Sequence, residues 1–127
     1  MSEFDPALGT LLPYAKYLGL QIDDAGDLRL PFRDDLVGNF RLGALHGGVV
    51  AAALECAALA WLRRHGATAR TIDFTTDYLR PAVSRDLHLT ATPVRIGRAV
   101  ATVRVEAWQI DPGRPVAAGH GNFALSA

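Results

Sequence analysis

The 127-residue chain has neither the excess of basic residues that a polyanionic partner would require nor the long apolar run that a membrane span would require. Its 13 basic residues balance 13 acidic ones, so the formal net charge at pH 7 is zero, and we expect no nucleic-acid partner. The longest apolar run contains a glutamate and is shorter than the roughly 20 residues of a membrane span. With a single cysteine, Cys56, the chain has no intramolecular disulfide. No apolar leader begins the sequence, so we expect a cytoplasmic protein with no membrane partner.

Nothing in the sequence divides the chain. Half of the residues are hydrophobic, and the length falls within the usual range of about 100 to 200 residues for one core, which predicts a single domain over residues 1–127. Apolar side chains at helical spacing predict a short helix near residues 6–17, although Pro13 argues for an interruption. Residues 18–23 and 27–32 alternate around a turn and predict a β-hairpin. Residues 33–45 are expected to be irregular.

The most apolar segment, GGVVAAALECAALAWL, predicts a buried helix. Its alanine content favours a helix from about residue 47 to residue 65, and Gly66 suits the left-handed position that follows a helix. Four later segments are rich in β-branched and aromatic residues, and the third alternates small apolar with polar side chains, which is typical of an antiparallel strand. These strands are residues 69–79, 86–96, 98–110 and 114–125. They predict an α+β fold in which a long antiparallel sheet, formed as a meander, is wrapped around one central helix.

Glu55 is the one charged side chain inside that apolar segment. Its neighbours one helical turn away are alanines and a leucine, so no residue of the same helix can pair with it. A buried carboxylate must find donors, accept a proton or line a cavity. A carboxylate in a roomy apolar pocket suits general-base or nucleophilic chemistry. The alternative is that Glu55 lies on a solvent-facing stripe of the helix.

The three residues His46-Gly47-Gly48 begin the predicted helix. The first N–H groups of a helix have no intrahelical partner, and the positive end of the helix dipole lies behind them. Donors of this kind can stabilise a developing oxyanion. The alternative is that the glycines only let the helix start close to a strand.

Taken together, these motifs resemble a known family. The run HGG, followed by a carboxylate within the helix, then TIDFTTDYLRPA and RIGRAVATVRVEAW, is similar to the hotdog-fold acyl-coenzyme A thioesterases of the phenylacetic-acid-degradation type. The resemblance covers roughly residues 30 to 125. It implies a hotdog fold, assembly as a homodimer or a homotetramer built of dimers, and hydrolysis of an acyl-coenzyme A (acyl-CoA) thioester to a free acid and coenzyme A. Apart from the thioester substrate itself, it implies no cofactor.

The resemblance also assigns roles to residues around the helix. Glu55 would activate water or attack the thioester carbon, and the backbone N–H of Gly47 would donate to the thioester oxygen. His46 would orient the site or contact the acyl carbonyl. The family's active site lies at a dimer interface, so that residues of a second subunit complete it.

Two further catalytic positions follow from the same resemblance. Thr71 matches a place where a hydroxyl from the partner subunit can position the water. The family often carries Asn or Gln six residues before the histidine. Here that position is Phe40, and Asn39 stands one residue further back, where a bulge would let it serve.

Substrate contacts are expected at Gly48 and at basic positions near the ends of the later strands. Arg80 and Arg98 match places where the family binds the nucleotide end of coenzyme A, with Gly97 beside Arg98 and Arg85 as a further candidate. An arginine can bind phosphate through two parallel hydrogen bonds. The histidines have no spacing with cysteines or acids that would predict a metal site.

Two other functions remain open from the sequence. One is an acyl-thioester hydratase or dehydratase of the same fold, because residues 38–55 resemble the pattern in which Gly-Asn leads into the acid-bearing helix. That pattern places a histidine before Gly38, and none precedes it here. The other is a protein that binds acyl-CoA without turning it over, which the displaced Asn39 keeps open.

Overall fold

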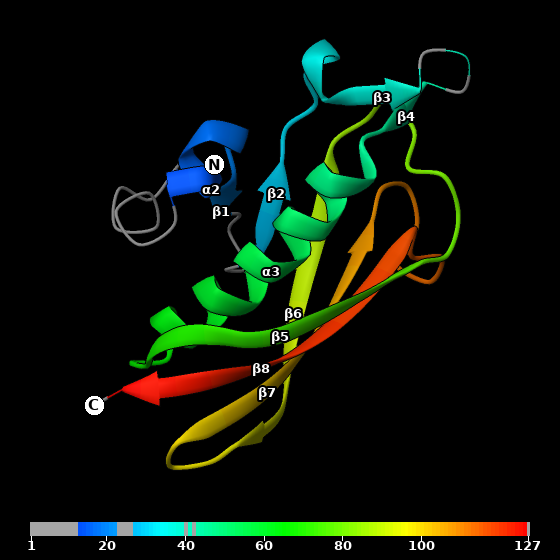
Figure 1. The fold of residues 1–127 in the computed structure, drawn as a ribbon. Coiled ribbons are helices and arrows are strands. Elements are labelled where there is room, and N and C mark those ends of the chain that lie inside the picture. Colours follow the sequence, from blue (N-terminus) through cyan, green and yellow to red (C-terminus); the bar gives the residue numbers. More distant parts are fainter. Residues whose placement is uncertain (1–12, 23–26, 40, 42, 127) are drawn as a thin grey trace.

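The computed structural model describes residues 13–22, 27–39, 41 and 43–126. Its helices and strands follow the chain in the order of Figure 1. They are α2 (Pro13–Leu18), β1 (Gln21–Ile22), β2 (Leu28–Leu30), a 3-10 helix (Asp34–Leu36), β3 (Val37–Asn39), β4 (Ala44–Leu45), α3 (Gly47–Arg64), β5 (Thr68–Tyr78), β6 (Leu87–Ile96), β7 (Val100–Trp108) and β8 (Ala117–Ser126).

A six-stranded antiparallel sheet curves around α3 (Figure 1). Its strand order is β1-β2-β6-β7-β8-β5, and α3 contacts β5, β6, β7 and β8. The predicted long sheet around a central helix is therefore confirmed. The predicted meander is wrong in one respect, because β5 pairs with β8 rather than with β6. The connection over residues 79–86 carries the chain from one edge of the sheet to β6, and β5 is left as an edge strand.

Helix α3 forms as the alanine-rich segment predicts. It ends at Arg64, one residue before the expected boundary, and Gly66 follows with a φ of +85° that residues with a side chain rarely adopt. Ala53, Leu54 and Ala58 on its inner face are fully buried. Among the helices in the described part of the chain, none is long and apolar enough to cross a membrane.

Small residues on the inner face of the sheet let α3 and a large aromatic ring come close. The alternation predicted for the third strand is confirmed, since Ala101, Val103 and the other small residues on that face of β7 are completely buried. In β8, a Cβ at Gly119 or Gly121 would come within 2.6 Å of the Phe74 ring. Glycines at these two positions therefore make room for Phe74 against the sheet.

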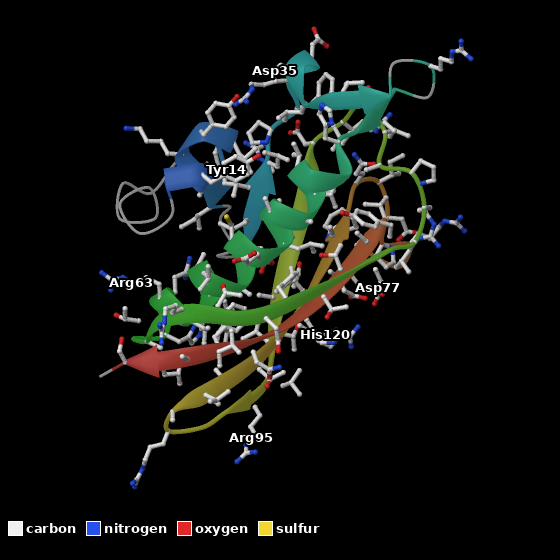
Figure 2. All side chains as sticks on the ribbon, viewed as in Figure 1. Tyr14, Asp35, Arg63, Asp77, Arg95 and His120 are labelled. Atoms are coloured by element: carbon white, nitrogen blue, oxygen red, sulfur yellow. The ribbon has the colours of Figure 1, made fainter. Side chains whose placement is uncertain are left out.

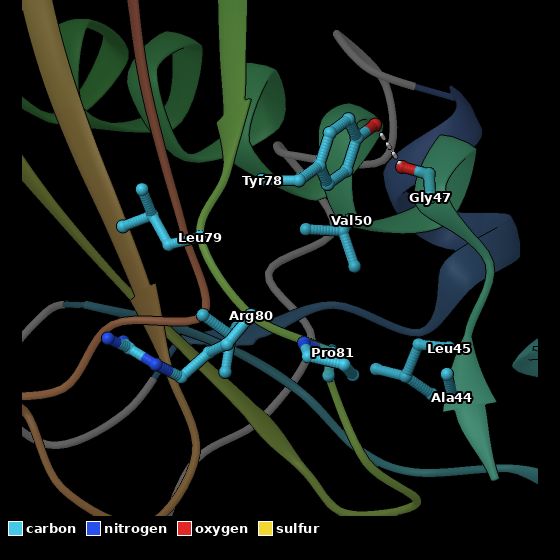
Figure 3. Close-up of a pocket in the computed structure, with 10 residues that line it drawn as sticks. Ala44, Leu45, Gly47, Val50, Tyr78, Leu79, Arg80 and Pro81 are labelled. Atoms are coloured by element: carbon cyan, nitrogen blue, oxygen red, sulfur yellow. Dashed lines mark hydrogen bonds between the residues drawn. The ribbon is translucent and has the colours of Figure 1, made fainter. Parts of the chain in front are cut away.

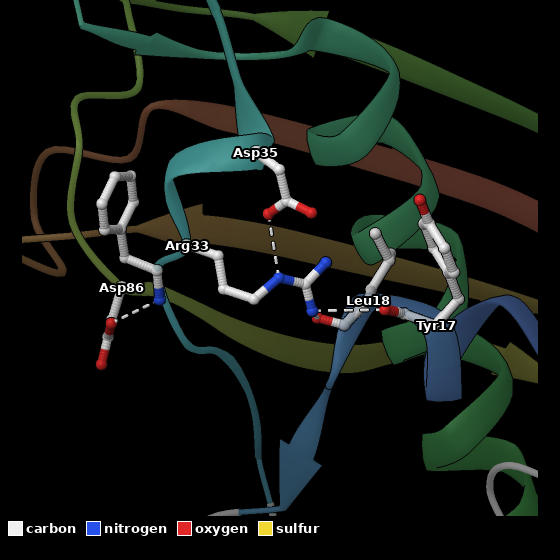
Figure 4. Close-up of polar contacts among 6 residues, drawn as sticks. Tyr17, Leu18, Arg33, Asp35 and Asp86 are labelled. Atoms are coloured by element: carbon white, nitrogen blue, oxygen red, sulfur yellow. Dashed lines mark hydrogen bonds and ion pairs between the residues drawn. The ribbon is translucent and has the colours of Figure 1, made fainter.

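The N-terminal part packs on the other side of α3. Residues 6–12 of the predicted N-terminal helix lie outside the described residues, and its remainder is α2. Figure 4 shows Arg33 donating to the carbonyls of Tyr17 and Leu18 at the end of α2, at 3.3 and 3.1 Å, and to Asp35 at 3.0 Å. The predicted hairpin before Arg33 is confirmed as β1 and β2. Residues 33–45 are more regular than expected, because β3 and β4 form a short two-stranded sheet.

Candidate active site

The start of α3 presents a glycine N–H beside an exposed histidine. The N–H of His46 donates to the carbonyl of Leu36 at 2.8 Å, and its carbonyl accepts the N–H of Val50 at 3.1 Å. Its imidazole lies against β3, where a Cβ at Gly38 would come within 2.5 Å of Nδ1. Within the described residues, no acceptor is found for the N–H of Gly47. This N–H is therefore available to an oxyanion.

Two turns further along α3, Glu55 meets a hydroxyl from the edge strand. Thr71 Oγ1 donates to Oε2 of Glu55 at 2.9 Å, and both side chains are half-buried. The sequence did not predict this contact: the resemblance implied only that a Thr71 hydroxyl from the partner subunit positions the water, whereas the hydrogen bond to Glu55 forms within one chain. This hydrogen bond gives the carboxylate a fixed position between α3 and β5.

A β-bulge in β5 turns Thr71 toward the helix. The pairing of β5 with β8 shifts register between Thr71 and Asp73, so that Thr71 lies opposite Phe123 and Phe74 lies opposite Gly121. Residues directly opposite each other share a face of the sheet, and Phe123 is fully buried on the inner face. Without the bulge, Thr71 and Phe74, three residues apart, would point to opposite faces. Bulges often occur beside functional sites, where they redirect a side chain in this way.

Cys56 lies next to Glu55 but has the properties of a core residue. Its side chain is buried. Burial, together with the negative charge of Glu55, raises the pKa of the Cys56 thiol from 9.0 to about 12. The thiol therefore stays protonated at neutral pH and is a poor nucleophile.

An apolar pocket of about 330 Å³ lies beside the start of α3 (Figure 3). Leu45, Val50 and Val116 contribute to its walls, together with Tyr78 and Arg80 from the end of β5 and the residues that follow it. The hydroxyl of Tyr78 donates to the carbonyl of Gly47 at 2.8 Å. The sequence did not point to Tyr78, because an aromatic residue at the end of a strand has no distinctive spacing.

The predicted coenzyme A positions do not all come together in one chain. Arg80 and Arg85 lie in the connection before β6, whereas Gly97 and Arg98 lie in the hairpin after it. The ten residues of β6 separate these ends by about 30 Å, and Figure 2 shows Arg95 close to the hairpin. A Cβ at Gly97 would come within 2.8 Å of the Val100 carbonyl, so the tight turn already accounts for this glycine.

Other predicted positions remain expectations. The pairing of β3 with β4 shifts register between Val37 and Asn39, which is the kind of irregularity that the Asn39 hypothesis needs, but the Asn39 side chain lies outside the described residues. Gly48 follows Gly47 in open surroundings, with no atom within 4 Å of the place of a Cβ. In the described part of the chain, no group of three or more His, Cys, Asp or Glu side chains could hold a metal ion.

Comparison with known proteins places this arrangement in a family. The family model of the thioesterase superfamily matches residues 42–116, from the approach to α3 through β7 to the last residue before β8. The chain belongs to the thioesterase superfamily. The medium/long-chain acyl-CoA thioesterase YigI of Salmonella typhimurium is 33% identical over 115 residues, which cover 75% of this chain and 74% of that protein.

Solved structures resemble this thioesterase over most of its length. A Bacillus halodurans protein solved with CoA is 28% identical, with a TM-score of 0.75 over 89% of this chain and 75% of that chain. A phenylacetic acid degradation-related protein of Ralstonia eutropha, described as a putative thioesterase, shares the fold, with 23% identity and a TM-score of 0.74 over 91% of this chain and 96% of that one. The resemblance seen in the sequence and the predicted hotdog fold are confirmed.

Proposed function

We propose that this thioesterase hydrolyses acyl-CoA to a free acid and coenzyme A, with Glu55 as the general base or the nucleophile. The observation that carries the proposal is the Thr71–Glu55 hydrogen bond at 2.9 Å, which holds the one carboxylate of α3 beside the edge strand. The name of the YigI relative and the coenzyme A in the Bacillus halodurans structure support the substrate class. The N–H of Gly47 stabilises the oxyanion that forms when the thioester carbonyl is attacked.

The spacing along α3 favours a site made from two chains. Eight residues separate Gly47 from Glu55, which at 1.5 Å per residue is about 12 Å along the helix axis. A thioester carbon under attack lies about 3 to 3.5 Å from its attacking atom, and the Glu55 carboxylate is turned aside to Thr71. One thioester is therefore contacted by Gly47 of one chain and Glu55 of the other, in a homodimer that joins along the free edge of β5.

The remaining predicted residues take supporting roles in this proposal. The exposed imidazole of His46 orients the acyl carbonyl beside Gly47, and Gly48 leaves space for the substrate. Asn39 keeps the role that the resemblance implies, a further polar contact to the substrate. Thr71 is a positioning residue, because it acts through the carboxylate that it contacts.

In this proposal, the arginines that bind the phosphates of one coenzyme A come from both chains of the dimer. Arg80 and Arg85 lie at one end of β6 and Arg98 lies with Gly97 at the other, so one chain cannot bring all of them to the same coenzyme A. In a dimer with antiparallel edge strands, the two ends of the sheet approach from different subunits. The phosphates are then held by Arg80 of one chain and Arg98 of the other.

Glu55→Gln tests the proposed function, because glutamine keeps the shape and can still accept the Thr71 hydrogen bond but cannot take a proton. We expect release of free thiol from medium- and long-chain acyl-CoA to fall by about 10² to 10⁴ in kcat. Glu106→Gln is the matched control, since Glu106 is exposed on the outer face of β7. Hydrolysis that survives Glu55→Gln unchanged would refute the assignment.

The same assay separates the alternatives that the sequence left open. Formation of an enoyl or hydroxyacyl thioester without free thiol would identify a dehydratase or hydratase. Tight binding of acyl-CoA with no product from the unaltered chain would identify a binding protein.

A further inference from the structure

Tyr78, the last residue of β5, reaches the first turn of α3. Its hydroxyl donates to the carbonyl of Gly47 at 2.8 Å, across 31 positions of the sequence (Figure 3). The side chain is 59% exposed in the single chain, so packing in the core does not account for where the ring lies. The hydrogen bond to the start of the helix is therefore the specific contact that this residue makes.

The bulge in β5 brings Tyr78 and Thr71 to the same face of the sheet. Tyr78 lies opposite Ala117, which is fully buried on the inner face. Tyr78 follows Thr71 by seven positions, so strict alternation would put the two on opposite faces. Because the bulge adds one residue to β5, both hydroxyls face α3 instead. That of Thr71 meets Glu55 and the other meets Gly47.

The main chain on both sides of Tyr78 is fixed by hydrogen bonds. Tyr78 pairs with Ala117 in β8, and the next N–H, that of Leu79, donates to the carbonyl of Val116 at 2.9 Å. The ring also forms part of the wall of the pocket that reaches Gly47. A hydroxyl carried by a strand end held in this way can set the position of the peptide group that it contacts.

The first turn of α3 has no capping side chain. A Ser, Thr, Asp or Asn at the cap position usually accepts the N–H of the second or third helical residue. Here the cap residue is His46, whose side chain makes no such bond. Within the described residues, no acceptor is found for the N–H of Gly48, and no atom lies within 4 Å of the place of its Cβ. This N–H is open to a ligand atom, and Tyr78 secures the turn from the carbonyl side.

The carbonyl of Gly47 and the N–H of Gly48 belong to one peptide group. A carbonyl oxygen has two lone pairs, so it can accept the Tyr78 hydroxyl as well as a helical N–H. Hydrogen bonds in series polarise one another, so a donor on the carbonyl makes the N–H of the same peptide a stronger donor. The N–H groups at a helix N-terminus point outward together. Those of Gly47 and Gly48 can therefore share one oxyanion.

We propose that Tyr78 is a positioning residue of the thioesterase site. Its hydroxyl fixes and polarises the Gly47–Gly48 peptide, so that the N–H of Gly48 is a second oxyanion donor beside that of Gly47. The inference rests on the proposed function, because it takes the thioester oxygen to lie at the start of α3. It gives a role to Tyr78, which the sequence did not single out, and makes Gly48 a donor as well as a source of space.

Tyr78→Phe tests the inference, because it removes the hydroxyl and keeps the ring. We expect kcat for acyl-CoA hydrolysis to fall about three- to tenfold with little change in KM, since the weakened donor acts mainly on the oxyanion of the transition state. Tyr17→Phe is the matched control, since Tyr17 is 67% exposed on α2, and it should hydrolyse at the rate of the unaltered chain. Both variants should melt close to the unaltered chain. A rise in KM alone would show that Tyr78 binds substrate and would overturn the inference.

Infrared difference spectroscopy reads the donors directly. In a Glu55→Gln chain, which leaves the thioester intact for longer, the stretch of an isotope-labelled thioester carbonyl is measured with and without Tyr78→Phe. Hydrogen bonds to a carbonyl lower its stretching frequency, so we expect Tyr78→Phe to raise the frequency toward that of the free thioester, and Tyr17→Phe to leave it in place. An unchanged frequency in Tyr78→Phe would overturn the inference whatever the kinetics, because a merely structural role does not alter the bonds to the carbonyl.

The two proposals fail in different ways. If the proposed function is wrong, the unaltered chain releases no thiol from acyl-CoA. If only the role of Tyr78 is wrong, hydrolysis still depends on Glu55 while Tyr78→Phe behaves like Tyr17→Phe in both measurements.

Discussion

Replacing Gly47 with proline would remove the proposed oxyanion donor while leaving the helix intact. Gly47 is the first residue of α3, a position where proline is favoured because the lost N–H has no helical partner. The residue before a proline must be extended, and His46 already has φ −54° and ψ 131°. A Cβ at Gly47 would lie 3.4 Å from the Tyr78 hydroxyl, which is close to ordinary contact.

Loss of one oxyanion donor typically lowers kcat by about 10² to 10³, or about 2.7 to 4 kcal/mol. We expect Gly47→Pro to show a fall in kcat of this size for acyl-CoA hydrolysis, with melting temperature and helix content close to those of the unaltered chain. Gly47→Ala is the matched control, because it adds the same Cβ but keeps the N–H, so its loss should be much smaller. Equal losses of kcat in Gly47→Ala and Gly47→Pro would show that the added side-chain volume, rather than the missing N–H, lowers the activity.

Mixing two inactive variants tests whether the site combines two chains. A dimer of one Gly47→Pro chain with one Glu55→Ala chain has one site with both defects and one with neither. Random assortment makes half of the dimers mixed, so unfolding and refolding the two variants together should restore about a quarter of the original activity. If Gly47 and Glu55 of the same chain act on one thioester, every site keeps a defect and mixing restores nothing. Absence of rescue from dimers shown to be mixed would refute the two-chain arrangement.

Two further predictions concern the surroundings of the carboxylate. Thr71→Val removes the hydroxyl without changing shape, so kcat should fall about tenfold with little change in KM; Thr71→Ser should restore it, and Thr76→Val on the same face of β5 is the control. The Cys56 thiol, with its pKa raised to about 12, should have a thiolate fraction of only about 10⁻⁴ at pH 8, against about 10⁻¹ for an ordinary thiol. Reaction with Ellman's reagent should therefore be slow in the folded chain and fast in guanidinium chloride, and fast reaction in both would contradict the assigned burial. Because the folded chain keeps a proton that the unfolded chain loses, the free energy of unfolding should also fall as the pH rises from 9 toward 12.

The sequence predicted the structure correctly where that structure depends on residues close together in the chain. Alanine content and Gly66 predicted α3 to within one residue at its end, because helix formation depends on contacts within a few residues. The alternation in β7 identified the face that packs on the helix, for the same reason. Glu55 stood out because an unpaired carboxylate is costly to bury in an apolar helix. In the structure it accepts a hydrogen bond from Thr71.

Strand alternation alone would have misplaced Thr71. In the sequence TIDF, strict alternation puts Thr71 and Asp73 on one face and the apolar Ile72 and Phe74 on the other, which suggests a threonine facing solvent. The bulge between Thr71 and Asp73 reverses this, and Ile72 is 56% exposed instead. A bulge is decided by pairing with β8, about 50 residues later in the chain, so no local pattern reveals it.

By itself, the sequence determined the central helix, the strands after it and the two features at which the chemistry is proposed, His46-Gly47-Gly48 and Glu55. Each of these depends on residues close together in the chain. Only the tertiary structure decided that β5 is an edge strand beside β8, that Thr71 reaches Glu55, and that Arg80 and Arg98 lie at opposite ends of the sheet. It also decided that the Tyr78 hydroxyl reaches Gly47. These facts depend on which distant segments pair, and strand pairing is set by packing over the whole chain.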